Sequence, residues 1–590
     1  MTNGGHTAGA TGTLAPAPEA ETVRHHEPTR GGSPRRGILP DVLLLAGIAL
    51  ALRLVQLDHA PHIDELYHAL AARSLLEDGT LLINGTEPYT RAWAFTYVVA
   101  GLMALFGDSL VVGRLPALLA GTGLVIAVFL WLNAVAGRTA GWTAALLVCF
   151  APVALYHSQQ IRFYTVHALF LWVAAAAAYA AATGSRDRTR TIILAGAAAA
   201  CLAIAYHLQV STLVSVAALA TWLALYRGAD VARWTAAGGP RRVRTVVGIV
   251  AVVVALAAVL AAGAAGAELV RKFSMVDVWA EADRDYVRYY HDRFLSQYPT
   301  LWTLFPVAVL LAASRYPRPA LFCVAMFGLP FIVHSIAAWK HERYLFYAVP
   351  FFFAVWGMAT AVALPWLRGR VEAAIRYAAP LHRRTAGVLA TATLAAAVVF
   401  AAAGNSSAMF TYRMLTVSDE DWKLSSAYRG EPVWQSALPV LQAEAAEADV
   451  VMGFAMVATL YYLDRLDLGL SATEVQRGES TAEFSVAGKE GVPVISRAES
   501  VRLVQSCIPS GLVIAGVRGW RNAWGVPPKT ADYIESSMER VALPENLGLQ
   551  VFRWRTADAG REPACAALRS HREAAAEAAR SARVVLRATR

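Results

Sequence analysis

The chain has 590 residues, of which 56% are hydrophobic and only 16% are charged, and its mean hydropathy is +0.42. Soluble globular proteins average about 25% charged residues, so this composition excludes a wholly soluble protein and indicates a polytopic α-helical membrane protein. The formal net charge is +10. The arginines fall mostly in short loops between apolar runs, where they set membrane topology, and we therefore expect no nucleic-acid partner.

Residues 1–38 are rich in glycine, proline and threonine and contain the basic sequence SPRRG. Low hydrophobicity favours a disordered segment, and we expect a cytoplasmic tail here. The polar leader is longer than that of a secretory signal peptide, so the first apolar run is predicted to be an uncleaved membrane anchor.

Residues 39–403 are predicted to form the transmembrane domain, because a helix needs about 20 apolar residues to cross a bilayer and about 11 apolar runs approach that length. The predicted spans are 39–57, 109–135, 139–157, 163–183, 190–206, 209–226, 243–266, 299–314, 318–338, 343–365 and 385–403. The run 91–106 is shorter and begins with Arg91, so it is ambiguous.

Four connections between these runs are strongly basic, which is typical of cytoplasmic loops: 184–190, 227–244, 314–319 and 368–384. All four lie on the same side as the N-terminus only if 91–106 is a re-entrant or interfacial helix. We adopt that arrangement for a multi-pass protein of the plasma (inner) membrane. It places the loops 58–108 and 267–298 and everything after residue 404 outside.

Residues 404–565 have a different pattern and are predicted to form an extracytoplasmic, soluble α/β domain. Apolar stretches at 449–454, 512–517 and 549–554 read as strands, and 530–541 reads as a helix. Cys507 and Cys565 would form a disulfide in an oxidising compartment; the alternative is two free thiols. The tail 566–590 carries six arginines on an alanine-rich helical pattern, which favours either a helix on the lipid surface or disorder.

The first outer loop carries the sequence HIDELYH, in which Asp64 and Glu65 follow the first span closely. Asp64 is predicted to be the N-cap of an interfacial helix that ends at Gly79, with Glu65 as a favourable first-turn anion. A carboxylate held rigidly at the membrane edge is also a plausible general base for a hydroxyl acceptor. A divalent metal on His62, Asp64 and His68 is an open alternative, but no metal or other cofactor is expected to be required.

Three further polar motifs fall on the same predicted face. Arg162 and Tyr164 either anchor a helix at the membrane interface or hold an anionic phosphate. The charged cluster 340–343 lies outside, against the charge rule, so a local task such as phosphate binding fits it. Glu87 and Arg91 are either solvated loop charges or part of the same site. The cluster 340–343 consists of Lys340, His341, Glu342 and Arg343, and Tyr344 follows it directly.

Residues 40–365 resemble the GT-C glycosyltransferases, and in particular the branch that holds the protein O-mannosyltransferases and the lipid A aminoarabinose and galacturonic acid transferases. The resemblance rests on DELYHALAARSLLEDG, FGDSLVVGRLPALLAG, SQQIRFYTVHALF and KHERYLFYAVPFF. It implies an inverting transfer of a sugar from a polyprenyl-phosphate donor to a hydroxyl acceptor on the outer face of the membrane. The acceptor is a lipid, a glycan or a protein.

The resemblance also implies roles for individual residues. Asp64 would be the catalytic base, with Glu65 supporting it, and Glu65 and His68 would hold the acceptor or the sugar. Arg162, Lys340 and Arg343 would stabilise the departing lipid phosphate. The chain has EPYTRAW where relatives acting on lipid A have a Lys-Pro-Pro-like element, so Arg91 is expected to replace that lysine.

Other functions compete with this interpretation. A transporter or flippase of lipid-linked sugars is typically marked by mid-bilayer charges and paired interrupted helices, and the sequence shows neither pattern. An oligosaccharyltransferase would need acidic motifs for a metal, and the single acidic pair disfavours it. A non-enzymatic assembly protein remains a further alternative.

Overall fold

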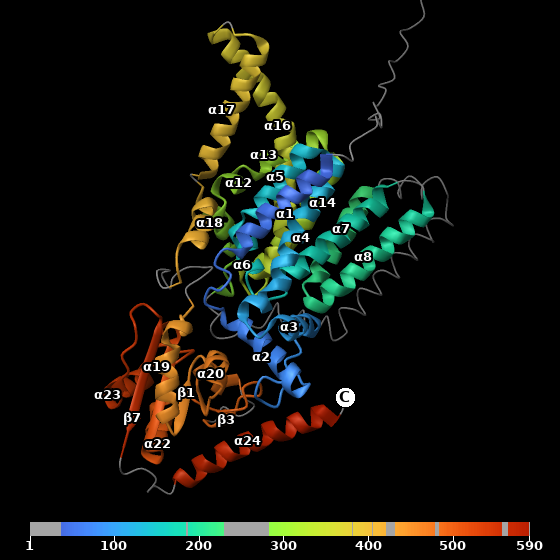
Figure 1. The fold of residues 1–590 in the computed structure, drawn as a ribbon. Coiled ribbons are helices and arrows are strands. Elements are labelled where there is room, and N and C mark those ends of the chain that lie inside the picture. The colour runs from blue at the N-terminus through green and yellow to red at the C-terminus, as the bar shows by residue number, and fades with distance from the viewer. Residues whose placement is uncertain are drawn as a thin grey trace, which may run out of the picture.

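The computed structural model describes residues 37–184, 187–228, 283–379, 381–403, 405–419, 431–477, 483–556 and 564–588. The predicted tail 1–38 lies outside these residues except for its last two, as do the predicted span 243–266 and the first part of the insertion 267–298. Figure 1 shows a bundle of helices with a sheet-containing unit at one end.

The bundle is built from apolar helices whose small and aromatic residues fill its core. Its helices are α1 (Ile38–Leu54), α3 (Trp93–Phe106), α4 (Leu110–Ala136), α5 (Arg138–Cys149), α6 (Pro152–Ser158), α7 (Tyr164–Thr183), α8 (Arg188–Leu208), α11 (Tyr289–Gln297), α12 (Pro299–Thr303), α13 (Phe305–Arg315), α14 (Pro317–Ile336), α15 (Glu342–Leu345), η3 (Phe346–Ala348), α16 (Val349–Ala378), α17 (Arg383–Ala403) and α18 (Ser406–Thr416). A shorter apolar helix covers Thr212–Gly228.

Within the described residues, five helices are long and apolar enough to cross a membrane, or six if one bent pair is a single span. This is fewer than the eleven predicted, partly because several predicted spans are broken or short. The run 139–157 bends by 63° between α5 and α6, where Pro152 begins the second helix. The run 299–314 divides into α12 and α13. Helix α3 has 14 residues and is about 21 Å long at 1.5 Å per residue, too short to cross the roughly 30 Å core alone.

Helix α2 (Ile63–Asp78) follows α1 and carries the acidic pair. Its N-cap is His62, whereas the sequence predicts Asp64 at this position. The His62 ring accepts a hydrogen bond from the Asp64 backbone N–H at Nδ1 (3.1 Å), and Glu65 accepts one from the His62 N–H (2.9 Å). This reciprocal pair satisfies two donors of the first turn. Gly79, with φ of +67°, ends the helix in the left-handed conformation that favours glycine.

In the C-terminal unit, the described residues form a seven-stranded sheet with the order β3-β4-β2-β1-β5-β7-β6. Strands β4, β2, β1 and β5 are parallel, while β3, β7 and β6 pair antiparallel at the edges. Its elements are α19 (Trp434–Glu447), β1 (Val450–Gly453), α20 (Met456–Leu463), β2 (Leu468–Leu470), α21 (Ala472–Arg477), β3 (Ser485–Val486), β4 (Pro493–Ile495), α22 (Ala498–Cys507), β5 (Ser510–Gly516), η4 (Val517–Gly519), α23 (Pro528–Ser537), β6 (Glu539–Arg540), β7 (Leu549–Arg555) and α24 (Ala564–Ala588).

The three predicted strands coincide with β1, β5 and β7, whereas the predicted helix 530–541 ends early and its last residues form β6. Cys507 and Cys565 are joined by a disulfide. The tail 566–590 is helical up to residue 588 and ion-pairs with the chain itself. Arg583 contacts Asp78 at the end of α2 (2.6 Å), and Arg572 contacts Asp467 (2.7 Å).

The sheet unit forms hydrogen bonds with α2 and with the loop that follows it. The backbone at 84–87 pairs with residues 488–489, for example through the Gly85 N–H to the Lys489 carbonyl (2.8 Å). The Tyr67 hydroxyl donates to Glu490 Oε1 (2.8 Å), and Glu490 is only 3% exposed. The helix that bears Asp64 is therefore held by the C-terminal unit as well as by the bundle.

Replacing Glu490 with glutamine is expected to stabilise this interface at neutral pH. Burial raises the pKa of the Glu490 carboxyl, so the folded state favours the protonated form. The resulting cost is absent below the unfolded pKa of about 4.3, grows as the pH rises through the folded pKa, and is complete above it. Glutamine keeps an oxygen for the Tyr67 hydroxyl without the charge.

The measurement is the thermal melting of the full chain in detergent over a range of pH. E490Q should melt above the wild type near about pH 8, and the difference should shrink toward about pH 4. An equal difference at both pH values would contradict a titrating Glu490.

Candidate active site

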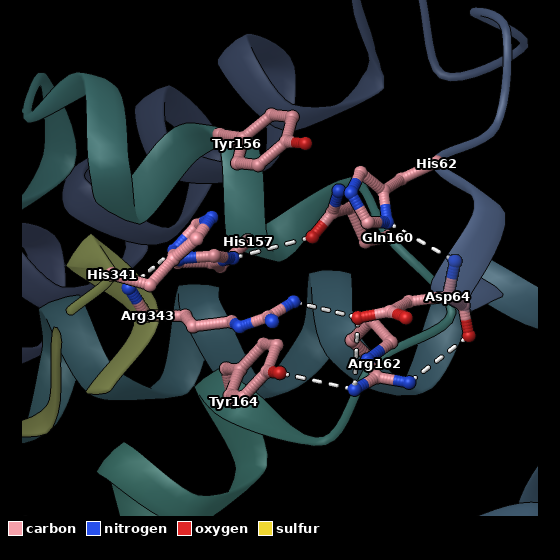
Figure 2. Close-up of a pocket in the computed structure, with 9 residues that line it drawn as sticks. All are labelled: His62, Asp64, Tyr156, His157, Gln160, Arg162, Tyr164, His341 and Arg343. Carbon is pink, nitrogen blue, oxygen red and sulfur yellow. Dashed lines mark hydrogen bonds and ion pairs between the residues drawn. The ribbon is translucent and has the colours of Figure 1, made fainter. Parts of the chain in front are cut away.

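Three segments that are far apart in the sequence meet at the end of the bundle nearest the sheet unit. They are the start of α2, the segment from α6 to the start of α7, and the start of α15. Figure 2 shows their side chains around one cavity, whose lining is His62, Asp64, Tyr156, His157, Gln160, Arg162, Tyr164, His341 and Arg343. The space free of atoms is about 220 Å³, part of it open to solvent.

Asp64 lies between two arginines. Its Oδ2 is 2.6 Å from Arg343 NH1 and 3.4 Å from Arg162 NH2, and its backbone carbonyl accepts a hydrogen bond from Arg162 NH1 (3.0 Å). Burial alone would raise the pKa of the Asp64 carboxyl, but Arg162 and Arg343 outweigh burial and hold the pKa well below its usual range. The carboxylate is therefore charged, and the three side chains together carry one net positive charge.

Each of the two arginines has one N–H group that donates no hydrogen bond to the described residues. The Nε atoms of Arg162 and Arg343 are buried and have no hydrogen-bond acceptor among the described residues. A buried N–H left without an acceptor costs about 1–3 kcal/mol, so an anion that accepted from these groups would be favoured. The remaining Arg162 contacts, to the hydroxyls of Tyr164 (3.0 Å) and Tyr89 (3.3 Å), hold its guanidinium in place.

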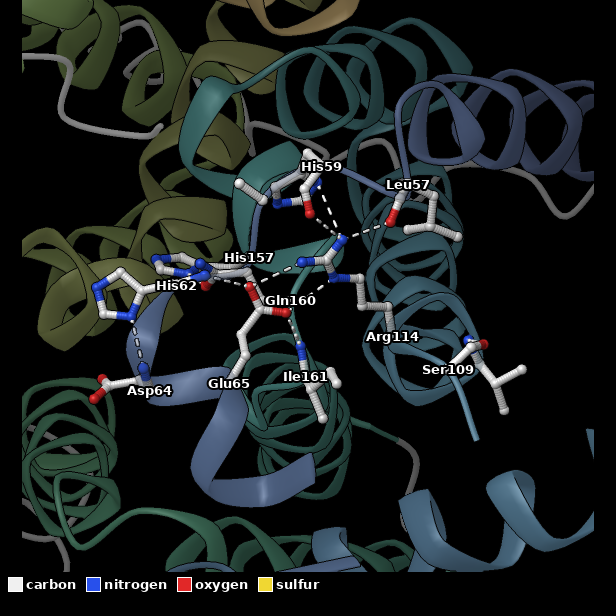
Figure 3. A network of polar contacts seen from close by, with 12 residues as sticks. Leu57, His59, His62, Asp64, Glu65, Ser109, Arg114, His157, Gln160 and Ile161 are labelled. Carbon is white, nitrogen blue, oxygen red and sulfur yellow. Dashed lines mark hydrogen bonds and ion pairs between the residues drawn. The ribbon is translucent and has the colours of Figure 1, made fainter. Parts of the chain in front are cut away.

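Glu65 does not line the cavity, contrary to its predicted role in catalysis and substrate binding. Figure 3 shows it in a buried network with Arg114 of α4. Arg114 donates from Nε to Glu65 Oε2 (2.9 Å) and from NH2 to Oε1 (3.2 Å), and both side chains are fully buried. Glu65 also accepts from the Ile161 N–H (2.8 Å). Every carboxylate oxygen is occupied, so Glu65 joins α2 to the segment that carries Arg162.

His68 is also placed differently from the prediction. Its ring is fully buried and lies edge-on to Tyr89 and Phe95. The Nδ1 atom shares a hydrogen bond with the Thr96 hydroxyl (2.9 Å). Burial lowers the pKa of His68 well below its usual range. It is a neutral packing residue behind the site. The described residues contain no cluster of three or more side chains that could hold a metal ion, and His68 does not join His62 and Asp64.

Glu87 and Arg91 do not line the cavity. Glu87 is exposed, and its backbone N–H donates to the Gly488 carbonyl (2.9 Å). Arg91 is exposed, and its guanidinium lies over the Phe163 ring at 5.6 Å. The positive charge of Arg91 still contributes to lowering the pKa of Asp64.

The cluster 340–344 divides between the cavity and its surroundings. His341 and Arg343 line the cavity. Lys340 is buried, donates to the carbonyls of Arg284 and Ala337, and does not line the cavity. Glu342 accepts a hydrogen bond from the amide of Gln297 (2.9 Å).

Tyr344 does not line the cavity either, and its ring lies 5.3 Å from the Arg343 guanidinium. Residues 341 and 343 line the cavity while 340, 342 and 344 do not, because consecutive residues at the start of a helix point to different sides.

Three cavity residues are not among the predicted site residues: Tyr156, His157 and Gln160. His62 is predicted only as a ligand of the alternative metal site. Gln160 belongs to the motif SQQIRFY, and His157 precedes that motif directly. Their proximity to Arg162 was the available signal. It was weak, because the sequence does not show that α6 ends at Ser158 and turns its last residues toward α2.

No protein-family model and no curated protein sequence matches the chain, whereas solved structures do. ArnT from Cupriavidus metallidurans bound to undecaprenyl phosphate matches with a TM-score of 0.53 at 16% identity, over 89% of this chain and 98% of ArnT. The apo oligosaccharyltransferase of Archaeoglobus fulgidus matches with a TM-score of 0.56 at 11% identity, over 82% and 70%. The oligosaccharyltransferase AglB from Archaeoglobus fulgidus, in complex with an inhibitory peptide and a dolichol-phosphate, matches with a TM-score of 0.51 at 12% identity, over 82% of this chain and 69% of AglB.

These proteins are glycosyltransferases of the GT-C type, and the chain has the GT-C glycosyltransferase fold. The fold that the sequence resemblance predicts is thereby confirmed.

Proposed function

We propose that the chain is a membrane glycosyltransferase that moves a sugar from a polyprenyl-phosphate donor to a hydroxyl acceptor on the outer face of the membrane. The observation that carries this proposal is Asp64 between Arg162 and Arg343 in one cavity of a GT-C fold. A carboxylate beside two arginines with spare donors combines a proton acceptor with an anion site. The acceptor is a lipid, a glycan or a protein.

These positions support the following reaction. Asp64 takes the proton of the acceptor hydroxyl while that oxygen forms a bond to the anomeric carbon. The bond from the anomeric carbon to the phosphate oxygen breaks, and its electron pair stays on the phosphate. Arg162 and Arg343 stabilise the added charge. Attack and departure on opposite faces of the sugar invert the anomeric configuration.

The placement of the cavity supports the outer face of the membrane as the site of transfer. The cavity lies at the end of the bundle that contacts the sheet unit, and that unit contains the Cys507–Cys565 disulfide. Disulfides persist in oxidising compartments. The start of α1, the end of α16 and the start of α17 lie at the opposite end of the bundle (Figure 1), as the predicted cytoplasmic side requires.

The proposal is tested by reconstituting the full chain in vesicles with a panel of undecaprenyl-phosphate-linked sugars and hydroxyl acceptors. Transfer is read by mass spectrometry as loss of donor and gain of undecaprenyl phosphate. Movement of an intact lipid-linked sugar across the vesicle without its cleavage would overturn the proposal in favour of the transporter or flippase. Binding of no undecaprenyl phosphate at all would also overturn it.

Replacing Arg162 or Arg343 with methionine is expected to weaken binding of undecaprenyl phosphate by at least about tenfold each, because each loses a charge-assisted hydrogen bond of about 1.5–3 kcal/mol. The measurement is a titration of the detergent-solubilised chain. Arg383→Met is the matched control, because Arg383 is exposed at the start of α17 and does not line the cavity, so this variant should bind like the wild type. Equal affinities in all variants would remove both arginines from the phosphate site.

A further inference from the structure

Two cavity histidines cap the helices that carry the charged residues of the site. The Nδ1 atom of His62 accepts the backbone N–H of Asp64 (3.1 Å), and the Nδ1 atom of His341 accepts the backbone N–H of Arg343 (3.2 Å). In each case the capped residue is the one that enters the Asp64–Arg343 ion pair. Both rings line the cavity.

These bonds fix the tautomer of each ring. A ring nitrogen that accepts a hydrogen bond from a backbone N–H has no hydrogen of its own, so the hydrogen of a neutral imidazole must be on Nε2. The Nε2 of His62 is 3.8 Å from Glu431 Oε1, which is longer than a hydrogen bond. Among the described residues, neither Nε2 has a hydrogen-bond acceptor. Two N–H donors of known position therefore remain for a ligand.

The charge of the cavity favours neutral donors over further cations. Asp64, Arg162 and Arg343 leave one net positive charge, which balances the single negative charge of a sugar phosphodiester. Additional cations would bind the more negative product phosphate too tightly to release it. Burial and the Arg343 charge lower the pKa of His341 well below its usual range, so its ring is neutral.

We propose that His62 and His341 bind the phosphate oxygens of the lipid donor through Nε2–H, as uncharged donors that complete the anion site of Arg162 and Arg343. This inference rests on the proposed function. It assigns each histidine two tasks at opposite ring nitrogens: Nδ1 caps a helix and Nε2 binds substrate.

Asparagine and glutamine separate the two tasks. Asparagine reproduces the acceptor at the Nδ1 position and is a favourable N-cap, but it lacks the distal N–H. Glutamine places an N–H near the Nε2 position and loses the cap. His62→Asn and His341→Asn should therefore melt like the wild type and bind undecaprenyl phosphate about tenfold more weakly. His62→Gln should melt at a lower temperature but bind more tightly than His62→Asn.

His382 is the matched control. Its Nδ1 accepts the Arg384 N–H (3.3 Å) in the same way, but the residue is exposed, directly precedes α17 and does not line the cavity. His382→Asn should leave binding and melting unchanged. A parallel titration with inorganic phosphate as competitor tells whether the phosphate group alone occupies the site or whether the lipid tail is needed.

Wild-type affinity in both His62→Asn and His341→Asn would show that the rings only cap helices, and would overturn this inference while leaving the proposed function intact. A wild-type chain that does not bind undecaprenyl phosphate would overturn both. If an asparagine variant melts below the wild type, the comparison of His62→Gln with His62→Asn decides, and equal binding by these two would also overturn the inference.

Discussion

Asp64→Asn is expected to lower the rate of transfer by about 10²–10⁴-fold and, at the same time, to tighten the binding of undecaprenyl phosphate by about tenfold. The rate falls because an amide cannot take the proton of the acceptor hydroxyl. The affinity rises because the carboxylate no longer competes with phosphate for Arg162 and Arg343. A residue that only maintained the fold would not move the two quantities in opposite directions.

The competition follows from the geometry of the ion pairs. Oδ2 of Asp64 lies 2.6 Å from Arg343 and 3.4 Å from Arg162, so we expect a phosphate that binds the Nε–H groups of these arginines to compete with the carboxylate for the same two guanidinium groups. The same contacts hold the pKa of Asp64 well below its usual range, which makes it a weak base in the free chain. Phosphate that draws the arginines away raises this pKa toward its ordinary value. Donor binding thereby prepares the base, and we expect the donor to bind before the acceptor.

The experiment measures transfer and undecaprenyl phosphate binding on the same preparation of the variant. Asp108→Asn is the matched control, because Asp108 also pairs with an arginine, Arg73, but is 41% exposed and lies outside the cavity lining. It should leave both quantities unchanged. Weaker phosphate binding by Asp64→Asn would contradict the competition and would mean that Asp64 orients the arginines instead.

The sequence predicts which segments form the site because polar motifs at the ends of apolar runs are visible in one dimension. HIDELYH, SQQIRFY and KHERY each contribute to the cavity, and the end of α2 at Gly79 is read from a single glycine. The same reasoning predicts the strands of the C-terminal unit from short apolar stretches. Hydropathy does not reveal where a helix breaks, so the runs 139–157 and 299–314 were predicted as single spans.

The sequence does not predict which of two neighbouring residues faces the cavity and which is buried elsewhere. Asp64 and Glu65 are adjacent, and successive positions on a helix point about 100° apart. Only the folded chain shows that one faces the cavity and the other faces Arg114, which is 49 residues away. Lys340 and Arg343 are also placed differently: Arg343 lines the cavity, whereas the Lys340 ammonium donates to two backbone carbonyls. Charge and residue type indicate which segments meet at the cavity but not which partner each side chain has.

Breaking the Glu65–Arg114 pair is expected to have the largest effect on stability. Glu65→Gln or Arg114→Met should each lower the free energy of unfolding by about 3–5 kcal/mol, because each leaves a buried charge without its partner. Arg114 also donates to the carbonyls of Leu57 (2.6 Å) and His59 (2.9 Å), so Arg114→Met should cost more than Glu65→Gln. The measurement is chemical unfolding of the full chain in detergent micelles.

The double variant Glu65→Gln with Arg114→Met should be more stable than the sum of the single losses implies, because no unpaired charge remains. Glu539→Gln is the control: Glu539 pairs with Arg553 on the surface and is 67% exposed, so the change should cost less than about 1 kcal/mol. Strict additivity in the double variant would contradict the pair.

Glu65 should also act on the reaction, as a positioning residue, since it joins the helix of Asp64 to the backbone of Ile161 beside Arg162. Glu65→Gln keeps an oxygen acceptor for the Ile161 N–H and should retain more activity than Glu65→Ala. The decisive readout is the pH dependence of transfer, because a displaced Asp64 has fewer arginine contacts and a higher pKa. A pH profile that Glu65→Ala leaves unchanged would limit Glu65 to stabilising the fold.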